Sequence, residues 1–356
     1  MANPNAVVSA RPSVWIDGSR VQSLEVALQN LSIRRTEGQI SDCEAEFANW
    51  GTTSDDRTGF TLFGGDVLDF GKRLEIRSGS DPLFQGRILS LEGKFPEMAP
   101  PTLVVKADDG FQDLRMSRRT RSFERSTDAD VLRTIAQDHG LQSDVSVTGP
   151  THPVLLQSNQ TDLEFAQQRA LFCDADLWLE DGKLCCKSRN SRSSVGFDLV
   201  FQDTLRSFTA TADLAHQRTA LVAGGWDVAS KSVIKERIDD AVLSQAASQG
   251  KTGPAVLKQA FGDRVDTMVH ASAIDAQEGK AAGQARFMAR SRRFLRGIGK
   301  ASCDARIKPA RKANITGLGP LFSGEWELVD VEHRFDLENG FRTEFVCERA
   351  WIGRYA

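Results

Sequence analysis

STDADVLRTIAQDHGL, residues 126–141, and QSNQTDLEFAQQRALFCDADLWLEDGKLCCK, residues 157–187, mark a change in the period of the apolar positions. In the first segment the apolar side chains follow helical spacing behind a Ser-Thr-Asp start, and Gly140 stands where a left-handed residue ends a helix. In the second, Thr161 and Glu164 have the spacing of a capping box, and Asp181-Gly182 is typical of a hairpin turn. The two segments predict a small α/β module in the order helix, strand, helix, hairpin.

Strand patterns flank this module on both sides. Residues 12–110 contain short alternating segments separated by Gly, Pro or Asp, including LEVALQNLSI, DCEAEFANW, KRLEIRSG, LFQGRILSLEG and TLVVKADD. Similar patterns return at 195–228 and 301–351, for example in SCDARI, GEWELVDVEHRFD and FRTEFVCERAW. Strands repeated this closely predict a β sandwich or barrel on each side, so the chain is expected to be mainly β with α elements.

Residues 231–296 interrupt the second β region. GPAVLKQAFG predicts a short helix, and a longer helix is predicted where small residues share one face with Met288 at Ala281, Ala285 and Ala289. A structureless loop of this length would be unusual inside a domain. We therefore expect a helical, polar insertion.

The overall composition excludes partner selection by bulk charge. The 356 residues contain 45 Lys and Arg against 48 Asp and Glu, which gives a formal net charge of -3. Six cysteines are scattered without a disulfide-type spacing, so reduced thiols are expected. No signal-peptide pattern precedes the first β region and no apolar run is long enough to span a bilayer, so a soluble protein assembled in the cytoplasm is expected.

Motifs for chemistry are incomplete. Gly250-Lys251-Thr252 lacks the earlier glycine of a phosphate-binding loop, and Asp174 with Asp176 lacks the further oxygen ligands of a divalent cation. Adjacent Cys185 and Cys186 point to opposite strand faces and cannot jointly bind zinc. We expect no cofactor, no metal and no enzymatic activity, and an unseen catalytic constellation stays open as an alternative.

Two arginine clusters are candidates for contact with other molecules. The first spans residues 115–125 and the second spans residues 286–296. Such clusters neutralise phosphates in nucleic-acid-binding proteins, but aromatic stacking partners are sparse here. Arginine also pairs with carboxylates across protein interfaces, which is the reading we favour. The candidate interface residues are Arg118, Arg119, Arg121, Arg292, Arg293 and the strand residue His333.

Several segments in order resemble the phage late control gene D family of baseplate hub proteins, which is also similar to the hub portion of VgrG spike proteins. The resemblance is carried by LFQGRILSLEGKF with LVVKADDGFQDL, by Asp138-His139-Gly140-Leu141, by residues 157–162, and by GLGPLFSGEWELVDVEHRFDLENGFRTEF near the C-terminus. It implies two related β-barrels, at 1–118 and 193–356, with the α/β module at 119–192 between them and the helical insertion at about 231–296.

The same resemblance implies a structural role. Family hubs form homotrimers in which two barrels per subunit make a ring of six similar units, and the ring adapts a hexameric tail tube to a trimeric spike. The expected partners are a tail-tube protein, other baseplate proteins and a spike; since the chain stops after the last barrel strand, the spike is expected to be a separate protein. Neither membrane nor specific nucleic-acid binding is expected. A cell-wall-degrading baseplate enzyme and a nucleic-acid-binding protein are the alternatives.

Overall fold

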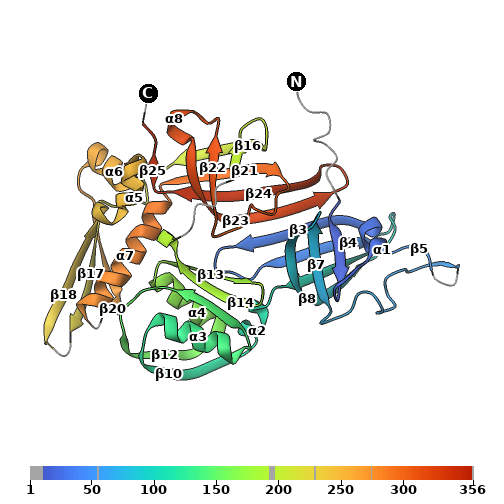
Figure 1. The fold of residues 1–356 in the computed structure, drawn as a ribbon, viewed down its shortest axis with the longest axis horizontal. Helices are drawn as coiled ribbons and strands as arrows, with labels where there is room; N and C mark the ends of the chain where they lie inside the picture. The colour runs from blue at the N-terminus through green and yellow to red at the C-terminus, as the bar shows by residue number, and fades with distance from the viewer. Residues whose placement is uncertain (1–10, 54–55, 192–196, 228–229, 274, 355–356) are drawn as a thin grey trace.

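The computed structural model describes residues 11–53, 56–191, 197–227, 230–273 and 275–354, and its ribbon is drawn in Figure 1. The fold is mainly β with α elements, as the sequence predicts. Within the described residues, the buried apolar side chains gather into four hydrophobic cores. Two of these cores lie inside β structure, one lies in the α/β module, and one lies beneath the longest helix.

The first β region is built from antiparallel strands around one core. Its elements are β1 (Ser13–Ile16), β2 (Ser19–Arg20), α1 (Gln22–Ala27), β3 (Leu28–Thr36), β4 (Asp42–Ala48), β5 (Gly51–Thr52), β6 (Thr58–Gly59), β7 (Arg73–Ser78), β8 (Asp81–Lys94) and β9 (Thr102–Asp108). The alternation predicted for 42–48 is confirmed, because Cys43, Ala45 and Phe47 are all buried. The strand predicted through Leu24 and Val26 is wrong, because both residues lie in α1. The buried side chains of Leu24 and Leu28 are four residues apart, a spacing that fits a helical turn as well as a strand.

The second β region contains the C-terminal strands. Its elements are β15 (Asp198–Val200), β16 (Leu205–Ala212), β21 (Leu295–Ser302), β22 (Lys312–Thr316), α8 (Gly319–Phe322), β23 (Gly324–Asp336), β24 (Gly340–Arg349) and β25 (Trp351–Ile352). The strand predicted at SCDARI is displaced: β21 ends at Ser302, and the next strand, β22, begins at Lys312. The two closing strands were predicted correctly.

The two β regions are joined into one 13-stranded sheet, in which β23 pairs with β3. The pairing runs antiparallel from Asp330 opposite Thr36 to Asp336 opposite Asn30. Along β23, Leu328 and Val331 enter the second core while Phe335 enters the first. One long strand therefore belongs to both cores and fixes the orientation of one β region against the other.

The α/β module contains the two predicted helices and the predicted hairpin, but two strands instead of one lie between the helices, and a strand that was not predicted precedes the first helix. Its elements are α2 (Phe111–Arg115), β10 (Arg118–Ser126), α3 (Asp128–Asp138), β11 (Gln142–Ser146), β12 (His152–Thr161), α4 (Asp162–Phe172), β13 (Ala175–Glu180), β14 (Lys183–Ser188) and η1 (Arg189–Ser191). Both predicted helix starts are confirmed as capping boxes, closed by Thr127 and by Thr161. Asp181 and Gly182 have positive φ in the turn between β13 and β14, as the hairpin prediction requires.

The insertion contains helices, and also strands that the sequence did not predict. Its helical elements are η2 (Asp240–Leu243), α5 (Ser244–Gln249), α6 (Gly253–Phe261) and α7 (Ala276–Arg292), and its strands are β18 (Ser232–Asp239), β19 (Lys251–Thr252) and β20 (Val265–Ala273). β18 and β20 pair with β17 (Ala220–Asp227), and α7 packs on this sheet. The buried Ile234 and Ile238 are four residues apart, a spacing that fits one face of a strand as well as one face of a helix.

The domain boundaries proposed from the sequence stay a prediction. The core of the α/β module includes Phe111 and Leu114 of α2, which lie before the predicted boundary at residue 118. In Figure 1 the first β region lies at one end, the α7 sheet at the other, and the module beneath the β3–β23 junction.

His333 lies on β23 at the β3–β23 junction, opposite Ile33 of β3. Its burial there can be tested through the pH dependence of stability. The side chain is completely buried, its Nδ1 lies 2.8 Å from the Thr343 hydroxyl, and burial lowers its pKa to about 3. Since an unfolded histidine titrates near 6.5, the folded state loses stability relative to the unfolded state as the pH falls from about 6.5 towards 3. The His333→Gln variant lacks this titrating group. We therefore expect the stability advantage of the wild type over the variant, measured as the free energy of unfolding, to be about 2 kcal/mol smaller at pH 4.5 than at pH 7.5.

Urea denaturation followed by tryptophan fluorescence measures this difference. An equal destabilisation at both pH values would contradict the buried neutral histidine.

Candidate subunit-interface site

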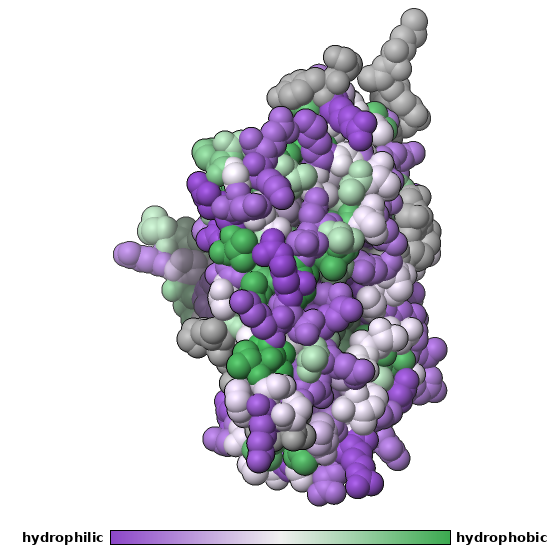
Figure 2. All heavy atoms as spheres, turned by 90° about the vertical axis from the view of Figure 1, so that its left-hand side faces the viewer, coloured by the Kyte–Doolittle hydropathy of each residue, from purple (hydrophilic) through white to green (hydrophobic). Residues whose placement is uncertain are grey.

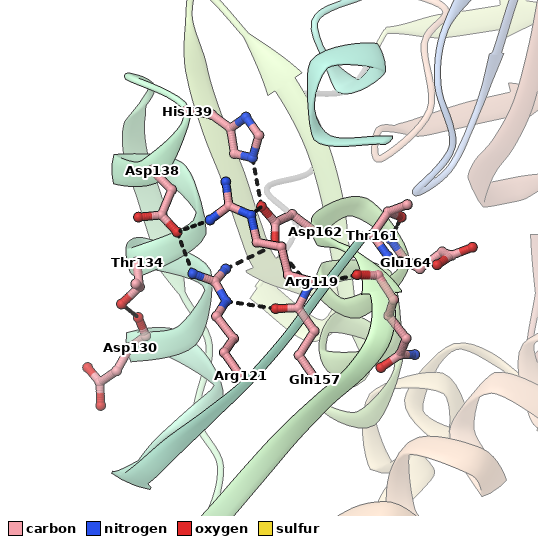
Figure 3. A network of polar contacts seen from close by, with 11 residues as sticks. Arg119, Arg121, Asp130, Thr134, Asp138, His139, Gln157, Thr161, Asp162 and Glu164 are labelled. Carbon is pink, nitrogen blue, oxygen red and sulfur yellow. Dashed lines mark hydrogen bonds and ion pairs between the residues drawn. The ribbon is translucent and has the colours of Figure 1, made fainter. Parts of the chain in front are cut away.

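Two of the candidate interface arginines converge on a buried carboxylate inside the module (Figure 3). Arg121 lies on β10, and its Nη2 donates to Asp162 Oδ1 at 2.9 Å, while Arg119 Nε lies 3.3 Å from Asp162 Oδ2. His139 Nε2 and Gln157 Nε2 also lie within 2.9 Å of this carboxylate. Asp162 is the first residue of α4 and is almost fully buried, so the arginines are drawn inward by a charge that needs partners.

The electrostatics of Asp162 follow from these partners. Burial by itself would raise the pKa of the carboxyl group, but the hydrogen bonds from Gln157 and His139 and the charges of Arg121 and Arg119 outweigh burial and lower it. Asp138, at the end of α3, accepts a further contact from each arginine, and Arg121 Nε also donates to Gln157 Oε1 at 2.8 Å. The network thus fastens α3, α4 and β10 to one another.

Arg118 is placed differently. Its guanidinium forms an ion pair with Glu164 at 3.2 Å, and both side chains are largely exposed. An exposed pair of this kind contributes little to stability because solvent screens it. Of the three arginines in this cluster, Arg118 offers the most surface to another molecule.

The second cluster divides in the same way. Arg292 is buried at the end of α7, where its Nη1 donates to Asp174 Oδ2 at 3.0 Å, while Arg293 is 75% exposed and lies 3.8 Å from Glu348. The predicted interface role of Arg292 and His333 therefore needs correction: both side chains are buried within the single chain and present no surface to a partner. For Arg118, Arg119, Arg121 and Arg293 the interface role stays a prediction.

A second buried carboxylate repeats the arrangement of Asp162. Asp128 is the first residue of α3, and it contacts Arg169 Nε, His152 Nε2 at 3.2 Å and Cys173 Sγ at 3.2 Å. The other ring nitrogen of His152 lies 3.3 Å from Glu278, in the first turn of α7. This network reaches from the module to the insertion.

Ion pairs also connect the module to both β regions. Arg189 pairs with Glu37 beyond the end of β3, and Lys308 of the second β region pairs with Glu180 on β13. Together with the pair between Arg292 and Asp174, these contacts place charged side chains at the junctions between the hydrophobic cores. Each arginine cluster thus contributes some side chains to contacts within the chain and leaves others exposed.

The residues considered for chemistry are engaged structurally. Asp174 and Asp176 each pair with an arginine, and burial raises the pKa of the Cys173 and Cys186 thiols far above the range of a reactive thiolate. Thr252 caps α6, and Lys251 lies in a strand paired with β25, which is not the geometry of a phosphate-binding loop. Among the described residues, no group of His, Cys, Asp and Glu side chains is arranged to hold a metal ion.

Sequence reasoning missed the two buried aspartates as organising centres. Both helices begin with the pattern Thr-Asp-x-acid, at Thr127–Asp130 and at Thr161–Glu164. The threonine and the last acid close the capping box, so the aspartate between them is free to point into the module. This repeated pattern was visible in the sequence, but its ionic partners were not.

Residues 7–336 match the family model of the Alg8 N-terminal domain. The chain belongs to that family. The sequence matches no curated protein, and no helix among the described residues is long and apolar enough to cross a membrane.

Several solved structures share the fold of this chain although their sequence identity to it is low. The 43 kDa tail protein of prophage MuSo2 from Shewanella oneidensis has a TM-score of 0.71 at 14% identity, covering 96% of this chain and 98% of that one. The tail protein from Neisseria meningitidis MC58 has a TM-score of 0.68 at 12% identity, covering 96% and 97%. The E. coli c3393 protein, described as a type VI secretion system component with structural similarity to T4 bacteriophage tail proteins gp27 and gp5, has a TM-score of 0.61 at 11% identity, covering 96% and 79%.

These results support the sequence resemblance at a coarser level. The fold is that of phage tail proteins, but the matching family model is the Alg8 N-terminal domain and not the late control gene D family.

The Asp162 network predicts a large effect of a small substitution. Asp162→Asn removes the buried charge that Arg119 and Arg121 share, and these partly exposed arginines keep Asp138 as a counter-ion. We expect a loss of about 2 kcal/mol in the free energy of unfolding, because solvent screens part of the lost pairing. Arg118→Ala, which removes the exposed pair with Glu164 and a hydrogen bond to the backbone oxygen of Asn159, is the control and should change stability less. Equal effects in chemical denaturation would contradict an organising role for Asp162.

The environment of His152 leads us to expect that the stability of the fold depends on pH in the alkaline range. Burial would lower its pKa, but hydrogen bonds with Asp128 and Glu278 outweigh burial and raise it to about 9. The raised pKa means that the stabilisation is complete below about 6.5 and is lost as the pH rises through about 9. We expect His152→Gln to be more destabilising at pH 6 than at pH 10 in urea denaturation. A destabilisation that grows with pH would contradict this sign.

Proposed function

We propose that this chain is a structural hub of a contractile phage tail or a phage-like contractile injection system. The observation that carries the proposal is the similarity of fold to the Shewanella prophage tail protein, which covers 96% of this chain and 98% of that one. A match over nearly the whole of both chains favours a shared architecture over a shared single domain. The type VI secretion component from E. coli extends the comparison to an injection machine.

In this proposal three copies form a closed ring, in which the two β regions of each copy supply six similar units. The ring adapts a hexameric tail tube on one side to a trimeric spike on the other, with the tube, the spike and further baseplate proteins as partners. The junction of β3 with β23 supports this arrangement, because it holds the two β regions of one subunit in a fixed relation. The particle is assembled in the bacterial cytoplasm, in line with the late control gene D resemblance.

A non-enzymatic role is part of the proposal. The aspartates and thiols that could have carried chemistry are held in buried ion pairs or have raised pKa values. No specific contact in the described residues favours hydrolysis of cell-wall polymers over assembly.

The proposal is tested by the assembly state of the purified chain. We expect a closed trimer by light scattering, either alone or with the tube and spike proteins encoded beside its gene, and we expect those proteins to co-purify with it. A strict monomer in the presence of both partners would contradict the hub assignment. Peptidoglycan turnover lost on replacement of a particular acid or histidine would favour the enzyme instead.

A further inference from the structure

Four aromatic side chains stack on one another at the surface of the first β region. We call them the aromatic end patch: Trp50, Phe60, Phe63 and Phe95. The rings of Phe60 and Phe63 are stacked with centroids 4.8 Å apart, and Phe60 contacts Trp50 edge-on at 5.2 Å and Phe95 at 6.0 Å. Each of the four remains at least 43% exposed. Contiguous exposed apolar surface of this kind marks a site of interaction.

Acidic residues lie close in sequence to the aromatic end patch. Asp66 follows Phe63 by three residues in an exposed bend, and Glu97 follows Phe95 by two residues on an exposed segment. The lysines of these segments are engaged, since Lys94 pairs with Glu46 and Lys72 donates to the backbone oxygen of Asp66. The patch therefore suits an apolar partner surface that carries positive charge.

A surface of that description lies on the sheet formed by β17, β18 and β20. α7 packs on one face of this sheet, where Leu221, Ala223 and Ile238 are buried. The opposite face, which we call the outer sheet face, carries Val222, Trp226, Val233, Val265, Lys235 and Arg237.

The outer sheet face is open and basic. Trp226 is 51% exposed and Val233 is 70% exposed. The surface above Gly224 is also open, because a Cβ atom added there would have only the backbone oxygen of Met268 nearby, at 3.7 Å. Lys235 and Arg237 are exposed, while the acid at the end of the strand, Asp239, is used to cap η2.

The two surfaces lie at opposite ends of the long axis of the molecule. In Figure 1 the loops that carry β5 are at one extreme and β18 is at the other. Figure 2 looks at the molecule from the β18 side and shows apolar patches among hydrophilic side chains. Two different, complementary surfaces at opposite ends of one chain join copies head to tail, and such contacts close into a ring when the rotation permits.

We infer that the aromatic end patch of one copy docks on the outer sheet face of a second copy of this chain. Trp226 packs against the exposed aromatic rings, and Lys235 and Arg237 face Asp66 and Glu97. The inference rests on the proposed function, because it names the surfaces through which subunits of the ring meet. A contact anchored by a central aromatic with charged residues around it is typical of protein interfaces.

Cysteine cross-linking tests the contact directly. Phe63→Cys and Val233→Cys, placed in the same chain, should give an intersubunit cross-link with a short bis-maleimide, seen as dimers and higher species on a denaturing gel. Each single variant, and the wild-type chain with its mostly buried cysteines, is the control and should stay uncross-linked.

Charge reversal tests its chemistry. Lys235→Glu with Arg237→Glu should raise the dissociation constant of the oligomer roughly a hundredfold, and Asp66→Lys with Glu97→Lys should do the same. All four substitutions in one chain should restore association. Lys183→Glu with Glu338→Lys, at exposed positions in the α/β module and in the turn between β23 and β24, is the control and should leave association unchanged.

The outcomes separate this inference from the proposed function. A closed trimer without the cross-link, or unaffected by charge reversal, would overturn the docking inference and leave the hub assignment standing. The cross-link in an open filament would support the docking surfaces and contradict the closed ring. A monomer in the presence of tube and spike proteins would overturn both.

Discussion

The pairing of β3 with β23 is the constraint on which the arrangement of the whole chain depends. It joins segments separated by about 300 residues and makes one sheet out of two β regions. Side chains reinforce it: Ser32 donates to Glu332 at 2.6 Å and Thr36 donates to Asp330 at 2.9 Å. Because β23 contributes to both hydrophobic cores, a shift of register by one residue would turn its apolar side chains out of both. The pairing is thus specified by two cores at once.

Ion pairs tie the α/β module to its neighbours: Arg189 with Glu37 and Lys308 with Glu180 towards the sheet, and Arg292 with Asp174 towards the insertion. A buried charge is costly unless it is paired, so each such contact favours one relative placement of two units over alternatives that leave a charge unpaired. Asp128 and Asp162 follow the same principle inside the module, since each begins a helix and collects cations from other elements. Part of each arginine cluster, Arg119 and Arg121 in the first and Arg292 in the second, serves this internal purpose.

Two exposed features of the described residues lie at opposite ends of the molecule. One is the aromatic end patch and the other is the outer sheet face. Their separation along the long axis is what the inferred contact between copies uses. The fold that carries them is shared with tail proteins from Shewanella oneidensis and Neisseria meningitidis.

The sequence by itself determined the local structure of the module: the two capping boxes and the Asp181-Gly182 turn depend on neighbours within a few residues, so their patterns are decisive. Where the spacing of apolar residues fits both a helix and a strand, the sequence could not decide between the two. Ile234 and Ile238 suit one face of a helix or of a strand, and both lie in a strand; Leu24 and Leu28 have the same spacing, but Leu24 lies in a helix and Leu28 begins a strand. Only packing against distant elements selected these structures. The partners of Arg121, Arg292 and His333 likewise come from tertiary structure, because the groups that bury and pair them lie far away in the chain.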